Sequence, residues 1–227
     1  MMMTSFKRAR SEEQRTQRRR MILDTTAAML AEMPVAHVSL NELSRRVGLA
    51  KSNVLRYFES REAVLLELLD AASQEWLEQL HDALTAAVNP NASPAERGDQ
   101  LAGTLAISLT GRPVLCDLIS TQAAVLEHNV SPQLAAQYKR AAIASVGVLA
   151  RLILQHVPEL GERDAQRLAL ATILVTSAVW THARPAAAML AAYEADPSLA
   201  SMRFDFTTTL RETLEVLTTG LLARPSR

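Results

Sequence analysis

This chain of 227 residues contains little of what marks several protein classes: one cysteine, seven glycines and 4% aromatic residues. A single cysteine, Cys116, excludes an internal disulfide and is typical of a cytoplasmic protein. The most apolar stretch, residues 168–180, is too short to span a bilayer and includes threonines and a serine. The basic N-terminus is not followed by an apolar core. We therefore expect no signal peptide and no membrane partner.

Motifs for catalysis and metal binding are also lacking. The sequence contains no Gly-x-Ser-x-Gly, His-Glu-x-x-His, Cys-x-x-Cys or Gly-x-x-x-x-Gly-Lys-Ser pattern. Its five histidines have no metal-ligand spacing among themselves. We expect no enzymatic activity, no cofactor and no metal.

The composition favours an all-α fold. Apolar residues make up 48% of the chain, and no run of alternating β-branched residues is long enough to predict a strand. Prolines and capping boxes divide the sequence into helical segments. The first expected helix starts at Ser11, whose spacing to Gln14 makes a capping box; a long helix follows Ser60, and the last helix covers residues 205–222.

Residues 39–58 have the features of a helix-turn-helix. Ser39 and Glu42 form a Ser-x-x-Glu capping box, with Val38 and Leu43 at the spacing of a hydrophobic staple. Gly48 can adopt the left-handed conformation that ends the first helix. A second helix then begins near Lys51, and such a pair places its second helix in the major groove of DNA.

The side chains of the second helix indicate what this unit binds. Lys51, Ser52, Asn53 and Arg56 are expected to point outward, where they can reach phosphates or base edges. Packing of the same hairpin inside a helical bundle is the alternative. The combined cap, staple and basic helix favour DNA binding.

Charge is distributed unevenly, although the chain as a whole is neutral. Residues 1–62 carry 12 Lys and Arg against seven Asp and Glu, a net charge of +5, which leaves −5 for residues 63–227. A basic N-terminal segment followed by an acidic remainder is typical of a protein that binds phosphates at one end. The excess charge is concentrated in the N-terminal segment, which can either reach DNA or stay solvated and disordered. Its basic residues are Lys7, Arg8, Arg10, Arg15, Arg18, Arg19 and Arg20.

Residues 11–69 resemble the DNA-binding domain of TetR-family transcriptional regulators. The resemblance rests on residues 43–49 (Leu-Ser-Arg-Arg-Val-Gly-Leu), Lys51, residues 56–58 (Arg-Tyr-Phe) and residues 60–65 (Ser-Arg-Glu-Ala-Val-Leu). It implies an all-α fold of about nine helices, with a DNA-binding domain over residues 1–62 and an effector-binding and dimerisation domain over residues 63–227. It also implies a homodimer that binds double-stranded DNA, which a small-molecule effector usually releases.

The expected DNA-contacting residues follow from the helix-turn-helix pattern together with this resemblance. They are Ser39, Arg45, Lys51, Ser52, Asn53, Arg56 and Tyr57, with Arg18 and Arg19 from the basic N-terminal segment. Two positions depart from the family. Ala50 stands where many members have a Ser or Thr cap, and Leu55 stands where many have a Tyr that contacts the DNA backbone, a contact that Tyr57 can supply instead.

Two C-terminal helices are apolar around much of their circumference, which predicts either a central core or a partner surface. By the resemblance, they would form a four-helix dimer interface that includes Leu170, Leu174, Leu210, Leu214, Leu217 and Leu221. Two-fold symmetry would then predict a near-palindromic operator.

Polar or aromatic groups on otherwise apolar helices are the candidates for an effector pocket: Gln122, His128, Tyr138, Trp180 and His182. The scarcity of charge in these helices indicates an apolar or weakly polar effector. The sequence thus predicts a cytoplasmic, ligand-responsive repressor. The alternatives are a constitutive DNA-binding regulator without an effector and a helix-turn-helix module that binds protein.

Overall fold

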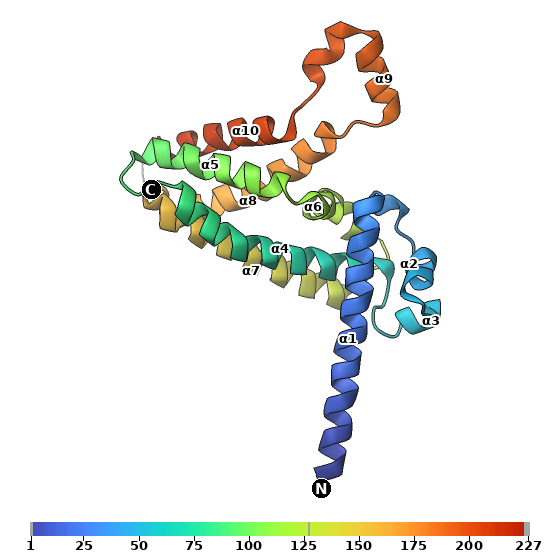
Figure 1. Cartoon of the computed structure of the whole chain (residues 1–227). Coiled ribbons are helices and arrows are strands. Elements are labelled where there is room, and N and C mark those ends of the chain that lie inside the picture. Colours follow the sequence, from blue (N-terminus) through green and yellow to red (C-terminus); the bar gives the residue numbers. More distant parts are fainter. Residues whose placement is uncertain (1, 127, 225–227) are drawn as a thin grey trace. The chain divides into compact units, whose positions relative to one another are not determined.

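A computed structural model describes residues 2–126 and 128–224, and this part of the chain is all-α, as the sequence predicts (Figure 1). Ten α-helices lie in it: α1 (Met2–Glu32), α2 (Leu40–Val47), α3 (Lys51–Val54), α4 (Arg61–Ala87), α5 (Pro94–Thr110), α6 (Pro113–Leu126), α7 (Pro132–His156), α8 (Gly161–Ala183), α9 (Ala187–Ala195) and α10 (Phe206–Leu222). Short 3₁₀ segments add η1 (Val35–His37), η2 (Pro158–Leu160) and η3 (Pro197–Met202).

Helix α1 is longer than the sequence predicts. The expected start at Ser11 is wrong, because α1 begins at Met2. The preceding residues contain neither glycine nor proline, so nothing in them stops the helix from extending towards the N-terminus. The side chains of Ser11, Lys7, Arg8 and Arg10 lie outside the described part of the structure.

The chain divides into two compact units. One comprises residues 1–70 and 122–138, and the other comprises residues 71–121 and 139–227. The division falls within three continuous helices, α4, α6 and α7, so each of them contributes to both units.

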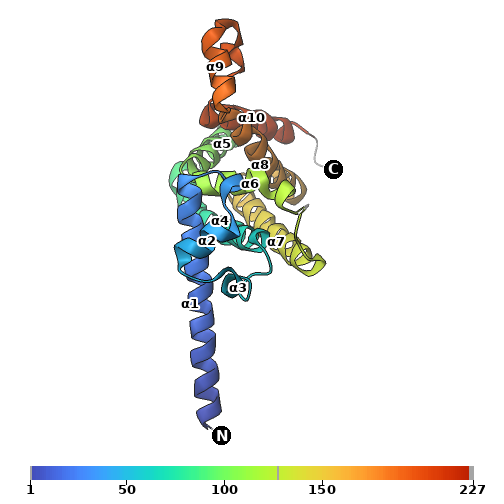
Figure 2. The same cartoon turned by 90° about the vertical axis from the view of Figure 1, so that its right-hand side faces the viewer.

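The first unit contains the helix-turn-helix. Helix α1 packs against α2, and α2 packs against α3. Its core holds Ile22, Met29, Leu43, Val54 and Phe58, whose exposed fractions are 3% or less. The first half of α1 continues well beyond α2 and α3 in both views (Figures 1 and 2).

The second unit is built around α10, which packs along α5 and against α8 (Figure 1). The close approach of α5 and α10 depends on Gly98, because a Cβ atom there would lie 2.8 Å from the Cγ2 atom of Thr218. Trp76 of α4 is buried, and its Nε1 donates a hydrogen bond of 3.0 Å to the Ser108 hydroxyl.

Cys116, on α6, also lies in the core of this unit. It is completely buried, and its thiol donates to the carbonyl oxygen of Leu109 at 3.4 Å. Burial, followed by the neighbouring Asp117 carboxylate, raises the pKa of this thiol to about 12. An inert core cysteine is what its apolar sequence context predicts.

Residues 185–204, which connect α8 to α10, form a segment that we call the arm. The arm includes α9 and η3, and it projects away from α5, α8 and α10 (Figures 1 and 2).

Within the described residues, no single helix is both long and apolar enough to cross a membrane; two pairs of helices, bent by 93° and 111°, reach that length and apolarity only when each pair is taken together.

Candidate nucleic-acid interface

The helix-turn-helix forms by the local interactions that its sequence predicts. The Ser39 hydroxyl accepts a hydrogen bond of 3.2 Å from the backbone N–H of Glu42 at the start of α2. Val38 and Leu43 are both buried, as a hydrophobic staple requires. Gly48 ends α2 in the left-handed conformation, with φ of 70°. The turn to α3 therefore follows from a capped start and a glycine stop.

Helix α3 is shorter than predicted. The outward-pointing residues from Lys51 to Arg56 indicate one exposed helix, but α3 ends at Val54 and a turn follows. In this turn the backbone N–H of Arg56 donates to Asn53 and that of Tyr57 donates to Val54, three residues back in each case. The tighter turn accompanies the burial of Phe58, which is 3% exposed.

The outward face of this segment has the composition that the sequence predicts. Lys51, Ser52, Asn53 and Arg56 are exposed, whereas Val54 is completely buried. Among the described residues, neither Lys51 nor Arg56 forms an ion pair, so both charges remain available. This face can therefore bind phosphates and base edges.

The two departures from the family pattern are visible here. Ala50 occupies the N-cap of α3 and provides no side-chain hydrogen bond. Leu55 is 41% exposed and has no polar atom to donate to a phosphate, while Tyr57 is half-buried. The expected contact from Tyr57 stays a prediction.

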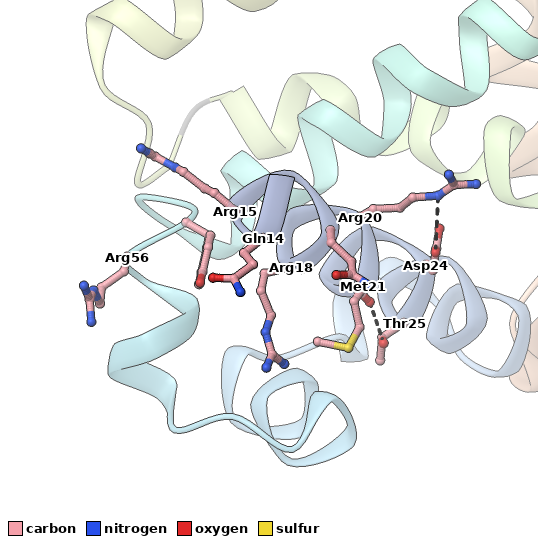
Figure 3. Close-up of a pocket in the computed structure, with 10 residues that line it drawn as sticks. Gln14, Arg15, Arg18, Arg20, Met21, Asp24, Thr25 and Arg56 are labelled. Atoms are coloured by element: carbon pink, nitrogen blue, oxygen red, sulfur yellow. Dashed lines mark hydrogen bonds and ion pairs between the residues drawn. The ribbon is translucent and has the colours of Figure 1, made fainter. Parts of the chain in front are cut away.

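A groove of about 1010 Å³ lies between α1 and the turn after α3. Arg18 and Gln14 project from α1, and Arg56 extends outward from the turn (Figure 3). Arg15 and Arg20 also line the groove, which makes its rim strongly basic. Arg20 lies 3.9 Å from Asp24, and an exposed ion pair of this kind contributes little to the stability of the fold. The groove adds anion-binding capacity beside the helix-turn-helix.

Arg19 is half-buried and has partners within its own unit, and its role as a DNA contact stays a prediction. Its guanidinium donates to the carbonyl oxygen of Tyr57 and to the carboxylate of Glu67, and it lies 4.3 Å from the centre of the Phe58 ring. These bonds hold the turn after α3 against α1 and α4. Arg19 thus holds the turn after α3 in place.

Arg45 is exposed but already has a partner. Its Nη2 atom lies 2.6 Å from a carboxylate oxygen of Glu42, and Arg46 donates to the same carboxylate at 2.9 Å. Hydrogen bonds from Arg45 and then Arg46 lower the pKa of Glu42 to about 2. Arg46 also binds Glu32 at 2.7 Å. The spacings of three and four residues on α2 signal this network, which the sequence analysis missed.

The effector-pocket candidates fall in both units. In the first unit, the Tyr138 hydroxyl donates to the Gln122 side chain, and burial raises the pKa of Tyr138. His128 is exposed. In the second unit, Trp180 is buried and donates to Asp117 at 2.5 Å, while His182 is exposed. Asp117 is a polar group at this position that the sequence analysis did not select.

The dimer-interface candidates separate into an inward and an outward group. Leu210 and Leu214 are completely buried in the core of their own unit, so their assignment to a partner surface is wrong. Leu217 and Leu221 are half-buried. Leu170 and Leu174 are 50% and 60% exposed. Val216 of α10, at 72% exposed, is an outward apolar residue that the leucine pattern did not include.

Family models match nearly the whole described chain. Residues 22–68 match the model described as bacterial regulatory proteins of the tetR family, and residues 70–225 match the model described as the tetracyclin repressor-like C-terminal domain. A search of curated proteins finds no match.

Several solved structures share the fold at low sequence identity. A TetR transcriptional regulator from Rhodococcus sp. RHA1 is 15% identical, covers 93% of this chain and 98% of its own, and gives a TM-score of 0.55. The fatty acid degradation regulator FadR from Bacillus halodurans is 13% identical, with coverages of 89% and 95% and a TM-score of 0.54. FadR from Bacillus subtilis, solved in complex with stearoyl-CoA, is 15% identical, with coverages of 88% and 97% and a TM-score of 0.54.

Proposed function

This chain belongs to the TetR family of DNA-binding transcriptional regulators, and from that membership we propose that it is a ligand-responsive repressor. In this proposal a homodimer binds a near-palindromic operator and leaves it when a small molecule binds. Residues 1–62 supply the DNA contacts, and residues 63–227 supply effector binding and dimerisation.

The observation that carries the DNA-binding role is the exposed face of α3 and its following turn, whose cations form no ion pair with any described residue. Lys51 and Arg56 supply positive charge, and Ser52 and Asn53 supply hydrogen-bonding groups beside them. Val54 is buried behind them and fixes the face that points outward. Such a segment binds the phosphate backbone through charge and reads base edges through its polar groups. Arg18 adds charge from the adjacent groove.

The homodimer is supported by the outward apolar residues of α8 and α10. Leu170, Leu174 and Val216 are each at least half exposed, although two helices of the core carry them. A self-complementary interface would cover these side chains on both copies. It would also fix the spacing between the two copies of residues 51–57, which we call the recognition segment. For this reason we propose an operator with two-fold symmetry.

The proposed effector is a small apolar or weakly polar molecule. Among the described residues after residue 62, the buried polar side chains are Arg97 and the three threonines Thr172, Thr176 and Thr218. A ligand inside this domain would therefore meet mainly apolar walls with few polar groups. The Bacillus subtilis FadR structure holds stearoyl-CoA, in which a long apolar acyl chain is joined to a charged CoA group, so only its acyl part resembles the proposed effector.

Release would follow from a difference in affinity. An effector that prefers the conformation with misplaced recognition segments lowers DNA affinity, and DNA must lower effector affinity by the same factor. A coupling of about 1–3 kcal/mol is typical of such systems.

Charge reversal on the recognition segment tests the proposed DNA role. Duplexes selected from a random library by the wild-type protein serve as the probe, and affinity is measured at graded salt. We expect Lys51→Glu with Arg56→Glu to weaken binding by at least about 100-fold and to flatten the salt dependence, because two cationic contacts become repulsive.

A matched control separates this effect from net charge. The double variant Arg151→Glu with Arg163→Glu changes the charge by the same amount at exposed positions of α7 and α8, and it should retain nearly wild-type affinity. Equal losses in both double variants, or no loss in a folded Lys51/Arg56 variant, would refute the proposed interface.

A further inference from the structure

The arm leaves several large apolar side chains more than one third exposed. None of the nine residues of α9, all of which are described, is buried. The large exposed apolar side chains of the arm are Met189 (48%), Leu190 (36%), Leu199 (38%), Met202 (57%) and Phe204 (38%). Exposed apolar groups that gather on one segment are typical of surfaces that bind another molecule.

Helix α9 is too short to be stable by itself. Isolated helices shorter than about 12–15 residues are marginal in water, and helices in proteins gain most of their stability by packing an apolar face. Helix α9 has nine residues and packs no buried side chain against the rest of its unit. It contacts η3 within the arm, and a further surface that covers its exposed side chains would add to its stability.

The root of the arm is firmly held, in contrast to its tip. Trp180 and Phe206, at the end of α8 and the start of α10, meet edge to face with ring centroids 4.9 Å apart. Asp117 accepts a hydrogen bond of 2.5 Å from Trp180 and pairs with Arg184 at 3.2 Å. The guanidinium of Arg184 also lies 4.9 Å from the centre of the Trp180 ring. This cluster fixes the two points where the arm leaves and rejoins the core, so the arm projects from a defined base.

We propose that the arm packs its apolar residues onto a second copy of this chain. This inference rests on the homodimer proposed above and gives it a further contact. The arm joins α8 directly to α10, and these two helices carry the outward apolar residues Leu170, Leu174 and Val216. A partner seated on these residues would lie against the two helices that the arm connects, so the same partner can also reach the arm.

The dimensions fit a second copy. Nine helical residues span about 14 Å, which exceeds the diameter of about 10–12 Å of a neighbouring helix with its side chains. Helix α9 is thus long enough to lie across one helix of a partner. In a two-fold dimer each subunit makes this contact with the other, so the contact occurs twice per dimer.

Sedimentation velocity over a concentration series tests the role of the arm. We expect Met189→Glu with Leu190→Glu to raise the dimer dissociation constant by at least about tenfold, because charges replace side chains that the partner would bury. These side chains are exposed in the single chain, so the variant should keep wild-type helicity. The control is Ile107→Glu with Ile143→Glu, two apolar residues of α5 and α7 that are 67% and 71% exposed. It should dimerise like the wild type.

A cross-link locates the contact directly. Benzoylphenylalanine in place of Leu190 should give a covalent dimer on illumination, with the linked peptide mapping to residues 71–227 of the other copy. Mixing of isotopically labelled and unlabelled protein distinguishes a link between copies from a link within one chain.

The outcomes separate the two proposals. A wild-type protein that stays monomeric at all concentrations would overturn the homodimer and the role of the arm together. A wild-type dimer that tolerates the glutamates, or a cross-link confined to one chain, would overturn the role of the arm and leave the homodimer intact.

Discussion

Glu59 accepts two hydrogen bonds from Ser131, one from its backbone N–H and one from its hydroxyl, each 3.0 Å long. Glu59 follows Phe58 in the segment between α3 and α4, and Ser131 precedes α7. The Ser131 hydroxyl also accepts a hydrogen bond of 3.2 Å from the backbone N–H of Leu134, which makes Ser131 a helix cap. The loop between α6 and α7 is thereby attached to the chain next to the recognition segment, within one compact unit.

Removal of either partner should reveal this attachment. We expect Ser131→Ala to lower the free energy of unfolding by about 1 kcal/mol, because it loses the cap and the hydroxyl hydrogen bond to Glu59. Glu59→Ala should have a smaller effect, since the cap remains. Urea denaturation of both single variants and the double variant gives the coupling, expected at about 0.5 kcal/mol or more for residues in contact. Strictly additive effects would show that the two residues do not interact in solution.

Arg18 and Arg19 are neighbours on α1 with opposite expected roles. Arg19→Ala should lower the free energy of unfolding by about 1–2 kcal/mol, because the bonds to Tyr57 and Glu67 and the contact with Phe58 are lost. This figure is discounted because the side chain is 32% exposed. Arg18→Ala should leave stability nearly unchanged and weaken DNA binding with a smaller salt slope. Thermal denaturation and a salt-graded binding assay on both variants compare them, and a reversed pattern would contradict both assignments.

His156 should make stability depend on pH. Its Nε2 atom is buried with no hydrogen-bond partner among the described residues, and burial, followed by the nearby His81, lowers its pKa. Its backbone carbonyl oxygen accepts a hydrogen bond of 2.8 Å from Arg97, which also pairs with Glu159. In the unfolded chain the histidine pKa is about 6.5, so the unfolded state takes up the proton first as pH falls. Stability from this site is therefore complete above about pH 6.5 and decreases as pH falls towards the lowered pKa.

The measurement is the melting temperature of His156→Gln and of wild type between pH 5 and pH 8. The variant should show a flatter decline below pH 6.5 than the wild type. His182→Gln, at an exposed position, is the control and should follow the wild-type profile. An identical slope in His156→Gln would show that this imidazole does not contribute.

Local relationships in the sequence were sufficient to predict most helix starts. Ser93 and Glu96 form a reciprocal capping box at the start of α5, as their spacing indicates. Ser39 caps α2, and Asp205 caps α10 through the N–H of Thr208 at 2.8 Å. Each of these interactions joins residues three positions apart, so the sequence contains all the information that they need.

Contacts between distant segments were not predictable in the same way. Glu59 and Ser131 are far apart in sequence, and no local pattern connects them. Arg19 is one of several arginines on α1, and only the tertiary packing shows that it turns inward. Leu210 and Leu214 lie on a helix with apolar residues on several faces, so the helical period does not show which face meets the core of the same chain. Such assignments need the position of the neighbouring helices.

The sulfur of Cys116 has a practical consequence for work on this protein. Because the only thiol in the chain is enclosed in the core and stays protonated far above neutral pH, the natural sequence already serves as a background for selective labelling. A cysteine introduced on the outward face of α3 or at the tip of the arm would be the sole reactive nucleophile of its kind. Dyes or spin labels attached there would report distances between copies without any further change to the protein.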